Sequence, residues 1–316
     1  LDEAMIQRGL AAPDGIQRSI HRLAAAVRFF TLADGALAAF HGGSACNAAL
    51  VAAARAQDET GDRPTAVELG GYHRLDGRGL QVIADAADPP HGAWAAGACA
   101  QPLAIEVVAG GRRLIDAGFG RTIETGSTVQ VGERPFGRLL GGFAGRVLGP
   151  RVVDARAGVE VARHEAPGAV WLELAHRGWL PRYGLLHQRR LYLDGGSGEL
   201  RGEDRLTPTA RAQGPDGRHF VPYALRFQLH PGVQALVSQD RRSVLLRPEG
   251  DAGGWLLRND ALDIEVEPAA RGGRPGLQIV LRGRRRADSG ARVRWKLSHA
   301  TARTAAPRVD AAPAQA

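Results

Sequence analysis

The chain has 316 residues, of which 44% are hydrophobic and 23% are charged, and its mean hydropathy is −0.20. This length allows one large domain or two domains of ordinary size. The sequence contains no heptad repeat, no collagen-like repeat and no apolar run of about 18 or more residues, which excludes a coiled coil, a triple helix and a transmembrane helix.

The formal charge of +8 and the isoelectric point near 10.5 indicate an anionic partner. Lys296 is the only lysine among 41 basic residues, and apart from residues 284–286 the arginines are scattered along the chain. A DNA-binding surface would concentrate them on one element. Because the planar guanidinium suits carboxylates as well as phosphates, the surplus favours an anionic partner in general and no specific nucleic acid.

The two cysteines do not fix the redox compartment. Cys46 and Cys99 are too few for a disulfide framework and too far apart for a redox or zinc pair, although a single disulfide stays open. The chain begins with Leu1, and no signal-peptide pattern is visible. We therefore expect either that a segment has been removed or that this is part of a longer chain.

Residues 1–40 have a helical pattern, with a break at residues 13–15. Apolar side chains recur at intervals of 3 and 4 from Ile16 to Phe30, which is typical of an amphipathic helix. The alanine-rich residues 46–56 predict a second short helix. Two helices cannot form a core alone, so they must pack on the rest of the chain or belong to a larger helical domain upstream.

From about residue 65 the pattern changes to short alternating or wholly apolar runs separated by glycine-rich turns. Many short strands at a spacing of roughly 8–12 residues predict a mainly β fold of antiparallel sheets stacked as a sandwich. We divide the chain into a helical segment (1–60), a first β region (61–206), a second β region (207–300) and a disordered tail (301–316). The predicted strands cover residues 80–84, 103–108, 113–116, 128–131, 152–154, 159–162, 169–175, 188–193, 223–229, 234–238, 243–247, 254–258, 262–267, 277–282 and 292–297.

The densest group of chemically active side chains lies in residues 176–194. In its alternating part, His187 and Arg189 share one strand face. Such a face suits an anionic sugar, because arginine neutralises a carboxylate, histidine or tyrosine moves a proton, and Trp179 offers a stacking surface. A solvated strand face with a tyrosine that anchors a hairpin explains the same pattern, and the sequence leaves both interpretations open.

Two further motifs end in polar residues. His230 follows Arg226 and precedes a proline, at the end of a strand, where it binds a ligand or metal or hydrogen-bonds the next turn. Asp116 ends an apolar strand, where it coordinates a cation or shapes the turn. The HxH, HExxH, CxxC, GxSxG and GxxxxGK[ST] patterns are all absent, so no metal site, serine nucleophile or phosphate loop is indicated by spacing.

Residues 176–206, 227–233 and 292–297 together resemble the heparinase II/III-like family of bacterial polysaccharide lyases, and more narrowly its alphaproteobacterial branch. Residues 27–40 resemble the junction at which that family's helical toroid meets its β region. The resemblance implies an N-terminal (α/α) toroid followed by stacked antiparallel sheets. This chain would then be the last toroid helices and the β portion of a longer enzyme of the cell envelope or periplasm.

The resemblance implies β-elimination on an acidic, uronate-containing polysaccharide. That reaction needs one group that neutralises the uronate carboxylate, one that removes the C5 proton and one that protonates the leaving oxygen. The candidate catalytic residues are His176, His187 and His230, and the candidate substrate-binding residues are Arg182, Tyr183, Arg189 and Arg226.

Several family members also carry a metal, bound through histidines and an aspartate in the first sheet. Asp116 matches the ligand aspartate, but Cys99 and Gly126 stand where histidines are expected. A cysteine and an aspartate alone make a poor site. We therefore expect no resident cofactor, with a divalent metal such as zinc as the alternative.

Three functions follow as hypotheses. The first is a lyase-family protein that acts on an acidic polysaccharide, or descends from enzymes that do. The second is a non-catalytic carbohydrate-binding or cell-envelope structural module, which the replaced histidines favour. The third is a general polyanion binder, nucleic acid included, which would show a steep salt dependence without sugar preference.

Overall fold

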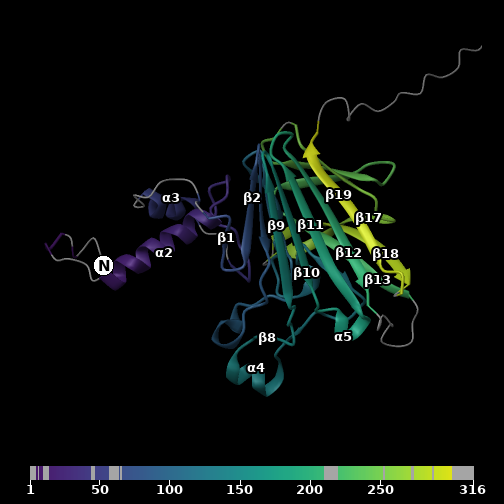
Figure 1. The fold of residues 1–316 in the computed structure, drawn as a ribbon, viewed down its shortest axis with the longest axis horizontal. Coiled ribbons are helices and arrows are strands. Elements are labelled where there is room, and N and C mark those ends of the chain that lie inside the picture. The colour runs from purple at the N-terminus through teal and green to yellow at the C-terminus, as the bar shows by residue number, and fades with distance from the viewer. Residues whose placement is uncertain are drawn as a thin grey trace, which may run out of the picture.

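Two large antiparallel β-sheets stacked face to face form most of the molecule, and two helices precede them (Figure 1). The structure is a computed structural model, and it describes residues 5, 7–9, 14–43, 47–56, 64, 66–209, 220–251, 253–271, 274–286 and 288–300. The predicted mainly β fold is confirmed. Cys46 and the predicted tail, 301–316, lie outside the described residues. Among the described residues, no helix is long and apolar enough to cross a membrane.

The first sheet has nine strands, and β6 (Val129–Val131) pairs with β13 beside its main path. Along that path the order is β1 (Glu68–Leu69), β2 (Tyr72–Gly77), β3 (Leu80–Asp85), β4 (Ile105–Ala109), β5 (Arg112–Asp116), β13 (Phe220–Leu229), β18 (Arg274–Arg286) and β17 (Asp263–Arg271).

The second sheet has eight strands. Their order is β14 (Val233–Val237), β15 (Ser243–Pro248), β16 (Trp255–Asn259), β19 (Ala291–His299), β12 (Glu199–Pro208), β11 (Leu185–Asp194), β10 (Ala169–His176) and β9 (Val159–Ala166). Each sheet takes strands from both predicted β regions, so the two regions fold together as one sandwich.

Several short elements lie at one end of the sandwich. A hairpin of β7 (Arg138–Leu139) and β8 (Val152–Val153) carries α4 (Gly142–Leu148) between its strands. Two 3₁₀ turns, η1 (Gly92–Ala96) and η2 (Ile123–Thr125), and the short helix α5 (Leu180–Tyr183) complete the described elements.

Alternation of side chains places the core between the sheets. In β11, every second residue from Leu185 to Leu193 is buried, and the residues between them are more exposed, as expected for a strand with one covered face. The apolar core that results joins Leu191 of one sheet with Leu225 of the other. The strand β12 has no counterpart among the predicted strands, because Gly202 and Asp204 interrupt its apolar face.

The helical segment is held to the sandwich by two buried arginines. The helix α2 (Asp14–Phe30) ends earlier than the predicted residue 40, because the chain turns at residues 34–35 and pairs with itself. The Nη1 atom of Arg74 donates to the carbonyls of Phe29 at 2.6 Å and Thr31 at 2.8 Å, which satisfies the end of α2. The second short helix, α3 (Ala48–Ala56), lies within the predicted range.

Arg113 makes the second attachment. It binds Asp34 at 2.8 Å and Glu106 at 3.1 Å, and Glu106 in turn accepts the backbone N–H of Ala39 at 3.0 Å. Burial raises the pKa of Glu106 to about 7, although Arg113 and the backbone N–H of Ala39 oppose this rise. The segment that links helix and sandwich is therefore fixed on the first sheet by an internal ion-pair network.

Candidate functional site

The face of β11 that carries His187 and Arg189 lies in the core of the sandwich, beside Asp204 of β12. The Nε2 atom of His187 lies 2.9 Å from Oδ1 of Asp204, and Nε of Arg189 donates to the same oxygen at 2.8 Å. The indole N–H of Trp295 donates to Oδ2 at 3.0 Å. We call Asp204, His187, Arg189 and Trp295 the Asp204 cluster.

Arg189 also connects the two sheets. Its Nη1 atom donates to the carbonyls of Leu103 at 2.7 Å and Ser127 at 2.9 Å, which precede β4 and β6 of the first sheet. One guanidinium thus binds an aspartate of its own sheet and two carbonyls of the opposite sheet. The alternation in the sequence correctly predicted that His187 and Arg189 share one strand face. That face is buried in the core, so it neither binds a sugar nor contacts solvent.

The charges of the cluster follow from burial and proximity. Burial opposes ionisation of Asp204, but Arg189 and His187 outweigh it and hold the pKa of this carboxyl well below its usual range. Burial lowers the pKa of His187 and lowers that of His176 well below the ordinary histidine value. Both rings are fully buried and neutral at pH 7, so we assign His176, His187 and Arg189 a structural role.

The side chain of Gln101, which sequence reasoning did not single out, packs against Gly126, one of the three expected metal-ligand positions. Its Nε2 atom donates to the carbonyls of Gly120 and Thr122 at 3.1 and 3.0 Å and to Oγ1 of Thr125 at 3.0 Å. A Cβ atom added at Gly126 would lie 2.6 Å from Cγ of Gln101. A histidine at position 126 therefore has no room while Gln101 is present.

Cys99 and Asp116, the other two expected ligand positions, do not form a metal site either. Cys99 is a buried free thiol whose backbone N–H donates to Nδ1 of His41 at 3.0 Å. Asp116 faces His230, and no group of three or more His, Cys, Asp or Glu side chains suited to a metal occurs within the described part of the chain. The residues present do not fit the metal centre that the resemblance implied.

Asp116 and His230 form the one pair of predicted site residues that remains partly accessible. Nδ1 of His230 lies 3.0 and 3.2 Å from the two carboxylate oxygens of Asp116. The His230 side chain is 35% exposed, whereas that of Asp116 is buried. An aspartate that holds Nδ1 leaves Nε2 as the ring nitrogen free for proton transfer.

The remaining predicted residues lie apart from this pair. Arg226 donates from Nη1 to Oε1 of Gln130 at 2.7 Å, and burial, together with nearby Arg282, lowers its pKa. Tyr183 is buried, with its ring against Gly132. Arg182 is exposed and donates to the carbonyl of Pro135 at 2.8 Å. The predicted substrate-binding residues therefore do not converge on one site.

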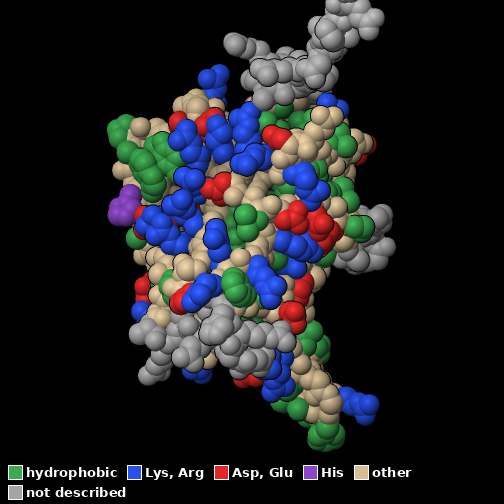
Figure 2. All heavy atoms as spheres, turned by 90° about the vertical axis from the view of Figure 1, so that its right-hand side faces the viewer, with side chains coloured by type: hydrophobic (Ala, Val, Ile, Leu, Met, Phe, Trp, Pro, Cys, Tyr) green, Lys and Arg blue, Asp and Glu red, His purple; other side chains and the backbone are tan. Residues whose placement is uncertain are grey.

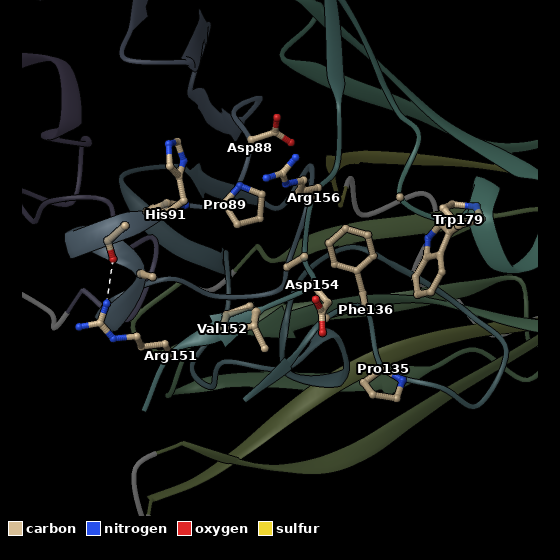
Figure 3. A pocket seen from close by; sticks show the side chains of 18 of the residues that line it. Asp88, Pro89, His91, Pro135, Phe136, Arg151, Val152, Asp154, Arg156 and Trp179 are labelled. Carbon is tan, nitrogen blue, oxygen red and sulfur yellow. Dashed lines mark hydrogen bonds between the residues drawn. The ribbon is translucent and has the colours of Figure 1, made fainter. Parts of the chain in front are cut away.

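A cavity of about 920 Å³ lies between η1, β8 and α5 (Figure 3), and Arg182 is one of the residues that line it. Figure 3 shows the rings of Phe136 and Trp179 and the guanidinium of Arg156 around this space. The Phe136 ring packs edge-on against Trp179 at 5.2 Å and against His176 at 5.6 Å, so buried aromatic residues back the cavity. The cavity therefore combines an apolar wall with exposed cations at its edge.

Replacing Asp204 tests the structural assignment of the buried cluster. The Asp204→Ala variant leaves the Arg189 charge buried without its counter-charge, so we expect its free energy of unfolding to fall by about 3–5 kcal/mol in urea denaturation. Glu203→Ala is the matched control, because Glu203 makes only surface ion pairs on the other face of the same strand, with an expected loss below about 1 kcal/mol. Equal losses would contradict the assignment.

A pH series adds a second readout. Because the pKa of Asp204 is depressed in the fold, its contribution is complete above the ordinary carboxyl pKa and is lost as the pH falls toward the folded value. The free energy of unfolding of the wild-type chain should therefore fall by the Asp204 contribution on acidification, and the Asp204→Ala variant should not show this part of the fall.

Restoring the two histidines tests the role of Gln101. We expect the Cys99→His/Gly126→His double variant to bind no more zinc than the wild type after dialysis, because Gln101 occupies the space that the second histidine needs. The triple variant with Gln101→Ala removes the obstruction and is the control. Stoichiometric zinc in the double variant, measured by plasma mass spectrometry, would show that Gln101 does not block the site.

Comparison with known proteins places the chain in a family. A family model described as "Heparinase II/III-like, C-terminal" matches residues 59–296. FtsZ-localized protein C of Caulobacter vibrioides is 44% identical over 319 residues, which cover 95% of this chain and 55% of that protein. The chain thus spans about half the length of this curated relative.

Two solved structures share the fold. Heparan sulfate lyase HepC from Pedobacter heparinus superposes with a TM-score of 0.65 at 12% identity, over 91% of this chain and 47% of that chain. Heparinase III gives a TM-score of 0.62 at 10% identity, over 91% and 49%. Likeness at this identity concerns the fold alone, but the family match covers most of the chain. The chain belongs to the heparinase II/III-like family and comprises its C-terminal β-sandwich.

Proposed function

We propose that this chain is a heparinase-like β-sandwich without lyase chemistry of its own, which binds an acidic polysaccharide within a protein that localises with FtsZ. The observation that carries the proposal is Gln101, which fills the space that an expected histidine ligand at position 126 would need and is held there by three hydrogen bonds. Burial of His176 and His187 supports the same conclusion, because a substrate cannot reach either ring.

The proposed ligand class rests on the charge of the chain and on the cavity. Arg156 and Arg182 are exposed cations beside a space of about 920 Å³, a size that small-ligand sites commonly have. Guanidinium groups bind carboxylates in a two-pronged geometry. The related HepC from Pedobacter heparinus is a heparan sulfate lyase, which supports an acidic polysaccharide as the partner.

The position in the cell rests on the Caulobacter relative, whose name states localisation with FtsZ. We propose the same position for the protein that contains this chain. The cell envelope is compatible with that position, whereas the periplasm is supported by the family resemblance alone.

The Asp116–His230 pair favours a second candidate, β-elimination on a uronate-containing polysaccharide. A partly exposed histidine oriented by a buried carboxylate is suited to remove a proton. Groups from outside this chain would have to neutralise the uronate carboxylate and protonate the leaving oxygen.

An assay of the full-length protein on a panel of acidic glycans separates the two candidates. We expect measurable binding without the rise in ultraviolet absorbance that an unsaturated uronate end produces, because the metal position is filled and two of the three histidines are buried. A rise that His230→Ala abolishes would establish the second candidate. Absence of binding to every glycan would remove the proposed ligand class.

A fluorescent fusion tests the proposed position. The full-length protein should follow FtsZ through the cell cycle and should become diffuse when FtsZ is depleted. A signal that is diffuse while FtsZ is assembled would contradict this part of the proposal.

A further inference from the structure

A row of side chains crosses the outer face of the second sheet, away from the cavity. Each member lies directly opposite the next on the neighbouring antiparallel strand, so all of them point to the same side. We call these residues the cross-strand row: His164, Trp171, Tyr192, Arg201, Lys296 and Arg258.

The row has an aromatic end. Trp171 is 40% exposed, and its ring lies 4.5 Å from that of Tyr192 at an interplanar angle of 42°. The guanidinium carbon of Arg201 lies 5.6 Å from the centre of the Tyr192 ring, which is a cation–π distance. An exposed tryptophan supported by a tyrosine offers an apolar plate on which a sugar ring can stack.

The other end of the row carries unbalanced positive charge. Arg201 and Lys296 share one carboxylate, that of Glu199, at 3.0 and 2.8 Å. Arg258 is exposed and makes no ion pair with any residue that the structure describes. Three cations against one carboxylate leave this part of the surface positive.

The neighbouring row on the same face behaves differently. There Glu173, Arg190, Glu203 and Arg294 follow one another across the strands with alternating sign. Arg190 lies 3.4 Å from Glu173 and 3.9 Å from Glu203, and Arg294 lies 2.8 Å from Asp260. That row neutralises itself, so the excess charge is a property of the cross-strand row.

The surface is hollowed along the row. A depression of about 500 Å³ is lined by Trp171, Tyr192, Arg201, Lys296 and Arg258 of the row. Two ion pairs of the neighbouring row, Arg190–Glu203 and Arg294–Asp260, also line it, and their charges balance. Figure 2, which faces the side of the molecule where β17 and β19 lie in Figure 1, shows many Lys and Arg side chains gathered on that side. The depression, the aromatic plate and the cations therefore occupy one continuous surface.

The spacing of the row is compatible with a linear polysaccharide. Neighbouring strands lie about 4.8 Å apart, so the row presents one group per 4.8 Å or so, close to the advance of one sugar unit in a linear polysaccharide. Side chains on the same side of an extended peptide recur at about 6.6 Å, so they lose register with the 4.8 Å spacing of the row after about two strands. We propose that the cross-strand row binds a linear acidic polysaccharide that runs across the strands, with a sugar ring on Trp171 and carboxylates on Arg201, Lys296 and Arg258.

This inference rests on the proposed function for its ligand class, and adds a binding surface separate from the cavity. The test measures affinity of the full-length protein for heparan sulfate and polygalacturonate oligosaccharides by calorimetry at fixed ionic strength. Trp171→Ala and Arg258→Ala should each weaken binding by about tenfold, because each removes one exposed contact. Both residues are on the surface, so circular dichroism should show unchanged folding.

Matched controls distinguish the row from charge or exposure in general. Arg292→Ala removes a cation from the same strand and face as Lys296 but beyond the depression, and Trp94→Ala removes an exposed tryptophan elsewhere. Both should leave affinity within about twofold of wild type. Poly-glutamate and single-stranded DNA should compete poorly at the same charge concentration.

Several outcomes would overturn the inference. Unchanged affinity in the Trp171→Ala and Arg258→Ala variants, or equal losses in the controls, would remove the cross-strand row as the site. Loss of binding only in Arg156→Ala/Arg182→Ala would move the site to the cavity and leave the proposed function standing. Absence of any glycan binding by the wild type would remove both proposals, and equal competition by poly-glutamate or DNA would leave a general polyanion surface.

Discussion

The ion pair between Arg189 and Asp204 is the contact on which the rest of the sandwich depends. Burying two charges between sheets is costly unless every donor finds an acceptor. Arg189 meets most of this condition, because Nε donates to Asp204 in its own sheet and Nη1 donates to two carbonyls that precede strands of the opposite sheet, whereas Nη2 is buried without a hydrogen-bond partner among the described residues. Asp204 also lies within hydrogen-bond distance of the His187 ring and accepts from the Trp295 indole. These directional bonds fix the separation and register of the sheets, which apolar contacts alone leave less specified.

With the scaffold fixed in this way, the chemistry at its surface can change without loss of the fold. Gln101 occupies the region where the family resemblance placed metal ligands, and its three hydrogen bonds stabilise the turns around Thr125 as an ion would. Asp116 is retained but faces His230 instead of a metal. A shared fold therefore says little about activity, and function has to be argued from individual sites. Here those sites are a cavity edged by arginines and an exposed row of aromatic and basic residues.

Alternating and wholly apolar runs predicted most of the strands, because strands such as β11 have one covered and one exposed face whereas β4 is buried along its whole length. This reasoning missed β12, although the strand is central, since Gly202 and Asp204 hold two of its inward positions and interrupt the apolar pattern. Gly202 is needed there because a Cβ atom would lie 2.1 Å from the Trp295 ring. Periodicity also extended the first helix past Phe30, where the chain turns back on itself and Arg74, distant in sequence, binds the carbonyls at the helix end.

By itself the sequence determined the mainly β class, the two short helices, the arginine-based positive charge and the likeness to heparinase II/III-like proteins. Only the tertiary structure decided that the His187–Arg189 face of β11 is buried, that Gln101 fills the space at Gly126, and that Trp171 and Arg258 stand in one row. The reason is physical. Alternation along a strand shows which residues share a face, but whether that face is covered, and which residues lie beside it, depends on strands that are far away in the sequence.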